Sequence, residues 1–399
     1  MIDFSATPLL VRNVRPIAIA GAPSTAIDVL VDADGRIAAT GRDLAAPAEA
    51  RVFEGGGAYL SPGWTDLHVH IWWGGTEISI MPDDCGLKRG VTTLVDAGSA
   101  GQASFAGFRR FIVEPARERV RAFLNIGSIG LIDSYNTSEL IDMRSIDIDK
   151  IIATVEANRD IIVGIKVRAS HVILNGWGIT PVKLAKKLGK ILKLPLMVHV
   201  GEPPPTYDEV LEVLGPGDIV THCFNGKAGG SIMEDEDLFD LVQRSADKGI
   251  RLDIGHGGAS FSFKVGEYAL KRGLKPFSIS TDLHARSLDG PAFDLATTMS
   301  KMMSVGMDLS DVVDAVTTAP ASVLGLATDG QLDVGRPAEF TIFDVVDADL
   351  SVRDSLGHAA LLAKMIEPRA VILGAETIAA SRHVPAKAAH CPCCGQAMP

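Results

Sequence analysis

The sequence lacks the features that mark membrane, secreted and disulfide-rich proteins. It has no run of eighteen or more apolar residues, so we expect no membrane-spanning helix. Its N-terminus has no basic start followed by an apolar stretch and a small-residue cleavage site, and we expect no signal peptide. Of its five cysteines, three crowd the C-terminus and two lie far apart, so they form no disulfide framework. These absences predict a cytoplasmic protein.

Basic charge is also in short supply. The chain has 38 Lys and Arg against 49 Asp and Glu, a net charge of −11, and no stripe of basic residues with interleaved aromatics. This balance predicts that neither nucleic acid nor an anionic membrane surface is a partner. We expect a small-molecule substrate instead, and a homo-oligomeric assembly.

A third absence concerns the fold. No glycine-rich phosphate loop follows the first strand of the central region, as an open sheet that binds a dinucleotide would require. The region contains eight short apolar runs, each followed by a loop and a helical stretch: GWTDLHVHI, VTTLVDAG, AFLNIGSIG, IVGIKVRAS, LPLMVHVGE, DIVTHCFNG, IRLDIGHGG and FSISTDLHA. Apolar strands that alternate with helices predict a parallel sheet in an α/β protein, and eight of them predict a (β/α)8 TIM barrel. The helical pattern is clearest at 181–193 and 235–248.

The two ends of the chain differ from its middle. Residues 1–60 and 331–385 alternate short β-type runs with turns, and Asp34-Gly35 marks a hairpin. We expect these segments to form one small β-sandwich domain beside a barrel of residues 61–330. The alternative is two separate β hairpins packed on the outside of the barrel.

The last segment, residues 386–399, is a cysteine-rich tail. Its Cys391-x-x-Cys394 spacing resembles half of a zinc ribbon, but a closed site needs four ligands and no second pair is present. His383, His390 or another subunit would have to complete it. The alternative is an oxidisable tail without a fixed structure.

Side chains suited to metal binding stand in or at the ends of five of the eight runs. They are His68, His70, Lys166, His199, His222 and Asp282. The two-residue period of a strand turns both imidazoles of the first run to one side, and barrel strands converge at one rim. Imidazole nitrogen and carboxylate oxygen are ligands of Zn²⁺ and similar ions. A lysine cannot bind a metal as an ammonium, but as a carbamate formed with CO₂ it offers two oxygens that could bridge two ions.

Each of these residues also has an ordinary interpretation. A His-x-His pair can be hydrogen-bonded inside a core, a buried Lys166 can pair with an acid, and Asp282 can cap a following helix. The whole order of residues, each at a strand end, is hard to explain by packing and favours a metal site.

Several segments resemble the amidohydrolase superfamily, in particular its dihydroorotase-like and deacetylase branch. The matching segments are SPGWTDLHVH, IKVRAS, VHVGEP, THCFNG, STDLHA, TTAPASVLGL and GQLDVGRPAEFTIFD. The resemblance implies that two divalent metal ions, expected to be zinc, are bound by the six residues, with Lys166 carboxylated by CO₂ as the bridge. It also implies that Asp282 is the catalytic acid/base, and that a metal-bridging hydroxide cleaves an amide or ester bond.

Departures from relatives narrow the expected substrate. An Arg that typically follows the His-x-His pair of dihydroorotases is missing from IWWGGTE, and VTTLVDAGSAG lacks the Cys ligand of D-aminoacylases. We therefore expect a small acylated compound of the N-acetyl amino acid or O-acetyl 2-hydroxy acid type, or a cyclic amide. The alternative is a deaminase of a nucleobase-like substrate that uses Glu202 as acid/base, because His199-Val200-Gly201-Glu202 matches the deaminase pattern. Lys166 argues against this alternative.

Candidate substrate contacts follow the strand ends. They are Arg168, Asn225, His256, His284 and Arg286. Either arginine could hold a carboxylate through two hydrogen bonds. The alternatives are an ion pair at the barrel rim for the arginines and no role for the histidines.

Overall fold

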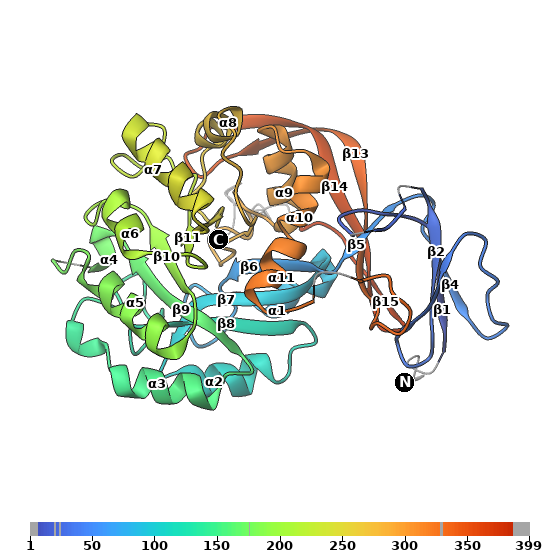
Figure 1. The fold of residues 1–399 in the computed structure, drawn as a ribbon, viewed down its shortest axis with the longest axis horizontal. Helices are drawn as coiled ribbons and strands as arrows, with labels where there is room; N and C mark the ends of the chain where they lie inside the picture. Colours follow the sequence, from blue (N-terminus) through green and yellow to red (C-terminus); the bar gives the residue numbers. More distant parts are fainter. Residues whose placement is uncertain (1–6, 20, 24, 175, 328–329, 386–399) are drawn as a thin grey trace, which may run out of the picture.

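The computed structural model describes residues 7–19, 21–23, 25–174, 176–327 and 330–385. It contains two sheets, one parallel and surrounded by helices, the other mixed and set at one end of the molecule (Figure 1). The predicted cysteine-rich tail lies outside the described residues.

The parallel sheet has seven strands in the order β12-β11-β10-β9-β8-β7-β6. They are β6 (Trp64–Val69), β7 (Val91–Gly101), β8 (Arg119–Asn125), β9 (Ile162–Ala169), β10 (Leu196–Val200), β11 (Ile219–Thr221) and β12 (Arg251–Asp253). Each neighbouring pair is parallel, as expected for apolar strands joined through helices. Seven of the eight predicted strands are thus confirmed.

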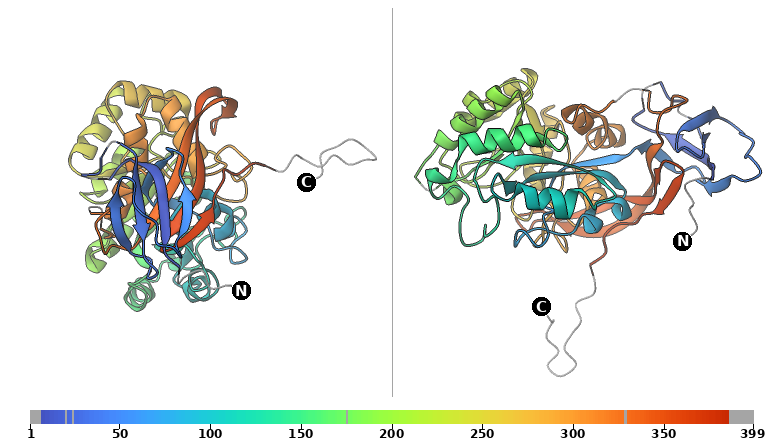
Figure 2. Two further views of the ribbon diagram at one scale, coloured as in Figure 1. Left: turned by 90° about the vertical axis from the view of Figure 1, so that its right-hand side faces the viewer. Right: turned by 90° about the horizontal axis from the view of Figure 1, so that it is seen from below.

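The helices lie around the outside of this curved sheet (Figures 1 and 2). They are α1 (Pro82–Cys85), α2 (Phe105–Phe108), α3 (Ile148–Ala157), α4 (His171–Leu174), α5 (Thr180–Leu192), α6 (Tyr207–Val213), α7 (Glu236–Asp247), α8 (Phe263–Lys271), α9 (Leu295–Ser304), α10 (Leu309–Asp314) and α11 (Thr318–Val323), with short helical turns at Leu87–Arg89, Arg109–Val113 and Met143–Ser145. The predicted helices at 181–193 and 235–248 are confirmed as α5 and α7. α5 buries Val182, Ala185 and Leu188, which recur three residues apart along one face.

The eighth predicted run, residues 277–285, is not a regular strand. It forms single parallel bridges on both sides, from Ser278 to Asp253 of β12 and from Leu283 to Val69 of β6. Extended pairing is interrupted because Asp282 adopts a positive φ of 47°. A complete eight-stranded barrel therefore stays a prediction.

The mixed sheet joins the two terminal segments of the chain. Its strands are β1 (Leu9–Pro16), β2 (Ile27–Val31), β3 (Ile37–Gly41), β4 (Arg51–Glu54), β5 (Tyr59–Pro62), β13 (Glu339–Arg353), β14 (Ala359–Leu373) and β15 (Glu376–Ala379). β5 pairs with β1 on one side and with β13 on the other, so the strands form one continuous mixed sheet, and a β-sandwich stays a prediction. Figure 2 shows the two terminal segments side by side. The hairpin at Asp34-Gly35 is confirmed by the antiparallel pairing of β2 and β3, whereas the domain boundaries stay a prediction.

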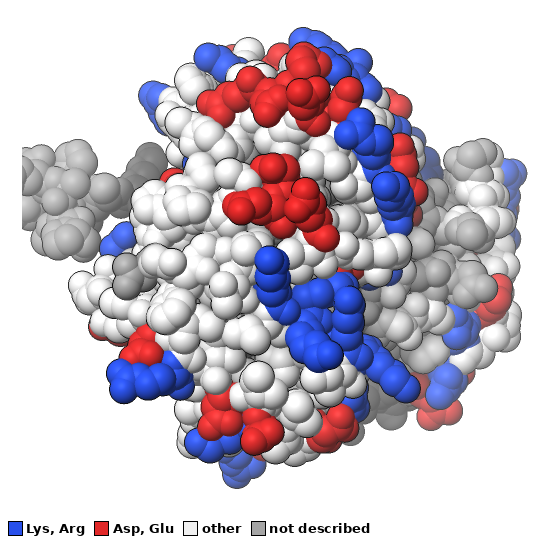
Figure 3. Space-filling model, turned by 60° about the vertical axis from the view of Figure 1, so that its left-hand side comes forward, with Lys and Arg blue, Asp and Glu red and all other residues white. Residues whose placement is uncertain are grey.

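Charge is segregated on the side of the molecule that carries α5, α6 and α7 (Figure 3). α5 contributes Lys183, Lys186, Lys187 and Lys190, and the helices beside it are rich in Asp and Glu. In Figure 3 the Lys and Arg side chains of this face form a narrow strip that adjoins acidic side chains. In the described part of the chain, no helix is both long enough and apolar enough to cross a lipid bilayer.

Candidate active site and metal centre

The six predicted metal ligands line one cavity of about 400 Å³ at the C-terminal ends of the parallel strands. They are His68 in β6, Lys166 in β9, His199 in β10, His70 and His222 directly after β6 and β11, and Asp282 in the bridging segment after β12. Parallel strands bring these residues together because their carboxyl ends meet at one edge of the sheet.

Asp282 is the centre of this group. Its Oδ1 atom lies 3.2 Å from Nε2 of His68 and 3.1 Å from Nε2 of His70, and its Oδ2 atom lies 4.0 Å from Nε2 of His222. One ligand atom from each of His68, His222 and Asp282 lies within 4.8 Å of the other two. The ring of His199 extends the group, 4.4 Å from the ring of His222 between centroids. This donor set of imidazoles and a carboxylate suits a borderline divalent cation.

Hydrogen bonds fix the orientation of two imidazoles. Nδ1 of His222 lies 2.7 Å from the carbonyl oxygen of Gly255, which can only accept, so Nδ1 carries the hydrogen. Nδ1 of His68 lies 2.9 Å from Oγ1 of Thr221. Because that hydroxyl donates its own hydrogen to Asp253, it accepts one from His68. With Nδ1 as the donor, Nε2 of each neutral ring is the nitrogen that faces Asp282 and that a metal ion could bind, as in ligands held by outer hydrogen bonds.

Lys166 is fully buried, and its amine faces the histidines. Its Nζ atom lies 3.4 Å from Nε2 of His68 and 3.5 Å from Sδ of Met197. Burial lowers its pKa to about 8, so a larger share of the amine is neutral near pH 7 than for an exposed lysine. The lysine fits beside β7 only because residue 98 is glycine. A Cβ atom at Gly98 would lie 2.7 Å from Cγ of Lys166.

Two of the predicted ligands have a strained backbone. His222 has φ of 70° and Asp282 has φ of 47°, a region that residues other than glycine rarely adopt. Such conformations persist where the surrounding structure enforces them, and they concentrate at functional sites. Gly255 and Gly257 leave room for them. A Cβ at Gly255 would meet the ring of His222 at 2.7 Å, and one at Gly257 would meet Oδ2 of Asp282 at 2.4 Å.

Cationic side chains form one wall of the cavity. Arg168 makes two hydrogen bonds to Glu139, of 2.8 and 2.6 Å, so its guanidinium is already engaged. Lys227 pairs with Glu202 at 2.9 Å. Arg286 is exposed and stacks over Tyr135, with its guanidinium carbon 3.4 Å from the ring centroid. Among the described residues no carboxylate pairs with Arg286, which leaves its charge for an anionic group in the cavity.

The other predicted substrate contacts divide into two sets. His284 lines the cavity, and its Nδ1 accepts a hydrogen bond from the backbone N–H of Arg286. Asn225 and His256 are buried outside the cavity lining. Asn225 donates to the carbonyls of His222 and Gly230, and His256 faces a buried lysine. That Asn225 and His256 contact the substrate stays a prediction, and neither residue lines the cavity.

Sequence reasoning missed several residues of the wall. Tyr135, which lines the cavity, and Glu139, which is buried behind Arg168, belong to a loop that has no periodic pattern, so nothing placed them near the cavity. Lys227 directly follows the THCFNG segment, and its position two residues after Asn225 was a signal that could have been used.

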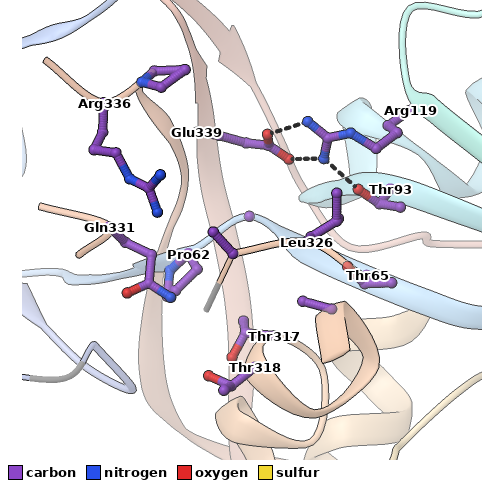
Figure 4. Close-up of a pocket in the computed structure, with 14 residues that line it drawn as sticks. Pro62, Thr65, Thr93, Arg119, Thr317, Thr318, Leu326, Gln331, Arg336 and Glu339 are labelled. Carbon is purple, nitrogen blue, oxygen red and sulfur yellow. Dashed lines mark hydrogen bonds and ion pairs between the residues drawn. The ribbon is translucent and has the colours of Figure 1, made fainter. Parts of the chain in front are cut away.

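A second cavity, of about 290 Å³, lies at the opposite ends of the strands (Figure 4). Arg119 of β8 pairs there with Glu339 of β13 and donates to Thr93. Among the described residues, the lining includes no histidine, and its one carboxylate is ion-paired. This cavity lacks the donor set of a metal centre.

Comparison with known proteins identifies the family of this chain. A model of the amidohydrolase family matches residues 263–377. A protein of Agrobacterium fabrum named as a deacetylase is 61% identical over 95% of this chain and 93% of its own length. The chain belongs to the amidohydrolase family. A crystal structure described as a dihydroorotase covers 95% of this amidohydrolase and 99% of its own chain, with 60% identity and a TM-score of 0.92. Another, described as an adenine deaminase, covers 94% and 100%, with 34% identity and a TM-score of 0.85.

Membership confirms the resemblance predicted from the sequence and makes this amidohydrolase a hydrolase. The family is generally metal-dependent, in agreement with the group of His68, His222 and Asp282. The identity of the metal, the number of ions and the carboxylation of Lys166 stay predictions.

Proposed function

We propose that this amidohydrolase is a metal-dependent hydrolase that removes an acyl group from a small molecule by cleaving an amide or ester bond. The observation that carries the proposal is the geometry at Asp282, whose carboxylate lies 3.1–3.2 Å from Nε2 of His68 and His70. The name of the Agrobacterium fabrum relative supports an acylated substrate.

Two divalent ions fit the donors present. His68 and His70 would hold one ion with Asp282, and His199 and His222 the other. Lys166, as a carbamate, would bridge them, and its lowered pKa favours the neutral amine that reacts with CO₂. Bound ions of this kind lower the pKa of water towards neutrality and polarise a carbonyl group.

The protein residues then have defined tasks. Asp282 accepts the proton of the attacking water and delivers it to the leaving nitrogen or oxygen. Arg286 holds a carboxylate of the substrate, because it lines the cavity and its charge is not engaged by an acid in the described structure. An acylated amino or 2-hydroxy acid suits both groups, because it would place its acyl bond near Asp282 and its carboxylate near Arg286. We also propose that the segment 278–283 closes the seven strands into a (β/α)8 barrel, on the basis of its bridges to β12 and β6.

A deaminase is the second candidate, supported by the relative described as an adenine deaminase. It would need Glu202 to carry a proton at neutral pH. Burial alone would raise the pKa of Glu202, but hydrogen bonds from Ser170 and Lys227 outweigh it and lower this pKa to about 2. Glu202 therefore remains an ionised partner of Lys227, and the deacylase is favoured.

A substrate screen on the purified protein tests the proposal. N-acetyl amino acids and O-acetyl 2-hydroxy acids, each in both chiral forms, would be assayed for acetate release, and nucleobases for ammonia release. We expect acetate release, about two metal ions per chain by elemental analysis, and loss of activity with a chelator. Ammonia release without acetate release would establish the deaminase, and a metal-free active protein would contradict both candidates.

A further inference from the structure

The outer halves of β13 and β14 form a long two-stranded arm. Residues 345–353 pair with residues 359–367, whereas β5 contacts only the first part of β13 and β15 only the last part of β14. Figures 1 and 2 show the arm leaving the mixed sheet and running along the helices to α8. An isolated two-stranded ribbon is marginally stable in water, so this arm depends on what it packs against.

The turn of the arm, residues 354–358, is bound to a loop of the active site. Ser355 accepts a hydrogen bond from the N–H of Phe261 at 3.2 Å and donates its own N–H to the Phe261 carbonyl at 3.1 Å. Its hydroxyl also lies 3.1 Å from the carbonyl oxygens of His256 and Gly257. Asp354, which is 2% exposed, accepts the N–H of Phe263.

Lys301 of α9 makes a second connection to the same loop. Its side chain is completely buried, and its Nζ atom lies 2.9 Å from Nε2 of His256 and 2.8 Å from the carbonyl oxygen of Arg353. The carbonyl of Pro291 takes the third position around the amine. The amine thus has an acceptor for each hydrogen that an ammonium group would carry, as a buried polar group requires, while burial lowers its pKa to about 7.

The loop held in this way, residues 255–260, is part of the cavity wall. Gly258, Ala259 and Ser260 line the cavity. Gly257 abuts Asp282 so closely that a Cβ atom there would lie 2.4 Å from Oδ2 of the carboxylate. A shift of the loop by a fraction of an ångström would therefore change the space around the proton carrier.

We propose that Lys301 and Ser355 are positioning residues that hold the 255–260 loop against Asp282, so that the arm of the mixed sheet sets the geometry of the catalytic cavity. The contribution of the terminal segments is then catalytic positioning as well as stability. This inference rests on the proposed function only in locating the reaction at Asp282.

Ser355→Ala is the sharpest test, with Ser355→Thr as the variant that keeps the hydroxyl and Ser300→Ala as the matched control. Ser300 of α9 accepts the N–H of Ile366 in the arm and, within the described structure, makes no hydrogen bond to the loop. For Ser355→Ala we expect kcat to fall about tenfold on a substrate of the screen, with metal content unchanged. Ser355→Thr should recover most of the activity, and Ser300→Ala should keep it.

Hydrogen–deuterium exchange measures how firmly the loop is held, and it needs no substrate. In Ser355→Ala the amides of residues 256–263 should exchange faster than in Ser300→Ala. Unchanged exchange would overturn the inference, and so would faster exchange with an unchanged kcat. Because exchange needs no turnover, failure of the proposed function and failure of this inference give different results.

Lys301→Met is a second test, because methionine has a similar volume to lysine but lacks the amine. We expect faster exchange at the same amides and a fall in kcat of about 100-fold beyond any loss of metal. A loss of activity that merely follows the unfolded fraction, with normal exchange in the folded protein, would assign Lys301 a purely structural role and contradict the inference.

Discussion

The two ends of the parallel strands both open onto cavities lined by polar groups, yet these groups are arranged in opposite ways. At the carboxyl ends, outer hydrogen bonds to Thr221 and Gly255 turn Nε2 of His68 and His222 towards Asp282 in the cavity. At the amino ends, Arg119 and Glu339 satisfy each other through two hydrogen bonds of 2.8 and 2.7 Å (Figure 4).

Backbone strain follows the same division. Positive φ angles occur at His222 and Asp282, beside the cavity at the carboxyl ends (the upper cavity). In the cavity at the amino ends (the lower cavity), Thr65, Thr93 and Glu339 lie in or at the start of regular strands. Backbone strain costs free energy, so it persists where the surrounding structure enforces it, and it concentrates at functional sites. The comparison favours chemistry at the carboxyl ends and stability at the amino ends, the division expected of a (β/α)8 barrel.

The largest effect is expected for Asp282→Asn. The amide keeps the size of the side chain but cannot accept the proton of the attacking water, so kcat should fall by about 10²–10⁴-fold. Activity of the purified variant on the best substrate of the screen, together with its metal content, measures this. A variant that retains near-normal turnover would remove Asp282 from the mechanism and with it the distinction between the two ends.

Gly98→Ala and Gly63→Ala compare the two cavities directly. A Cβ at Gly98 would clash with Lys166 and is strained at φ of 92°, so activity should drop by about 100-fold along with bound metal. A Cβ at Gly63 would lie 2.3 Å from Oγ1 of Thr92 at the lower cavity. That variant should lose stability in thermal unfolding, while its folded fraction keeps the turnover of the wild type. Equal losses of turnover in both variants would contradict the comparison.

Site residues that lie in regular strands could be predicted from the sequence, whereas those that lie in irregular loops could not. The two-residue period of β6 and the apolar surroundings of Lys166 in β9 sufficed to predict that these side chains meet at the strand ends. The partner of Arg168 could not be predicted, since Glu139 lies in a loop whose sequence shows no period. The contact of Ser355 with His256 was equally inaccessible, because 99 residues separate them along the chain.

The fold shows the same limit. Alternation of apolar runs with helical patterns predicted seven strands correctly, and turn residues predicted the first hairpin. The single mixed sheet was not foreseen, because edge-to-edge pairing of β5 with β13 leaves no trace in either segment alone. The eighth run reads as a strand, and its irregularity comes from the backbone of Asp282, which the residue type does not reveal.

Arg286→Met should change substrate affinity more than turnover. Removing a cation that holds a carboxylate should raise KM for acylated acids by about 10–100-fold, while uncharged acyl amides or esters keep their KM. Steady-state kinetics on an acid and on its methyl ester make the comparison, with Lys183→Met on α5 as a control cation far from the cavity. Equal changes for both substrates would assign Arg286 to packing on Tyr135 instead.

The smallest effect on activity is expected for Arg119→Met at the lower cavity. Arg119 and Glu339 are 32% and 24% exposed, so loss of the pair should cost about 1–3 kcal/mol of unfolding free energy and leave kcat unchanged. Burial alone would raise the pKa of Glu339, but Arg119 outweighs it and holds this pKa below 4.5. A carboxyl with a lowered pKa contributes stability above pH 4.5 and loses it as the pH falls through the folded-state value. The difference in Tm between wild type and Arg119→Met should therefore be full at pH 7 and shrink below pH 4.5. A difference that is independent of pH would mean that the arginine stabilises this end through packing and not through its charge.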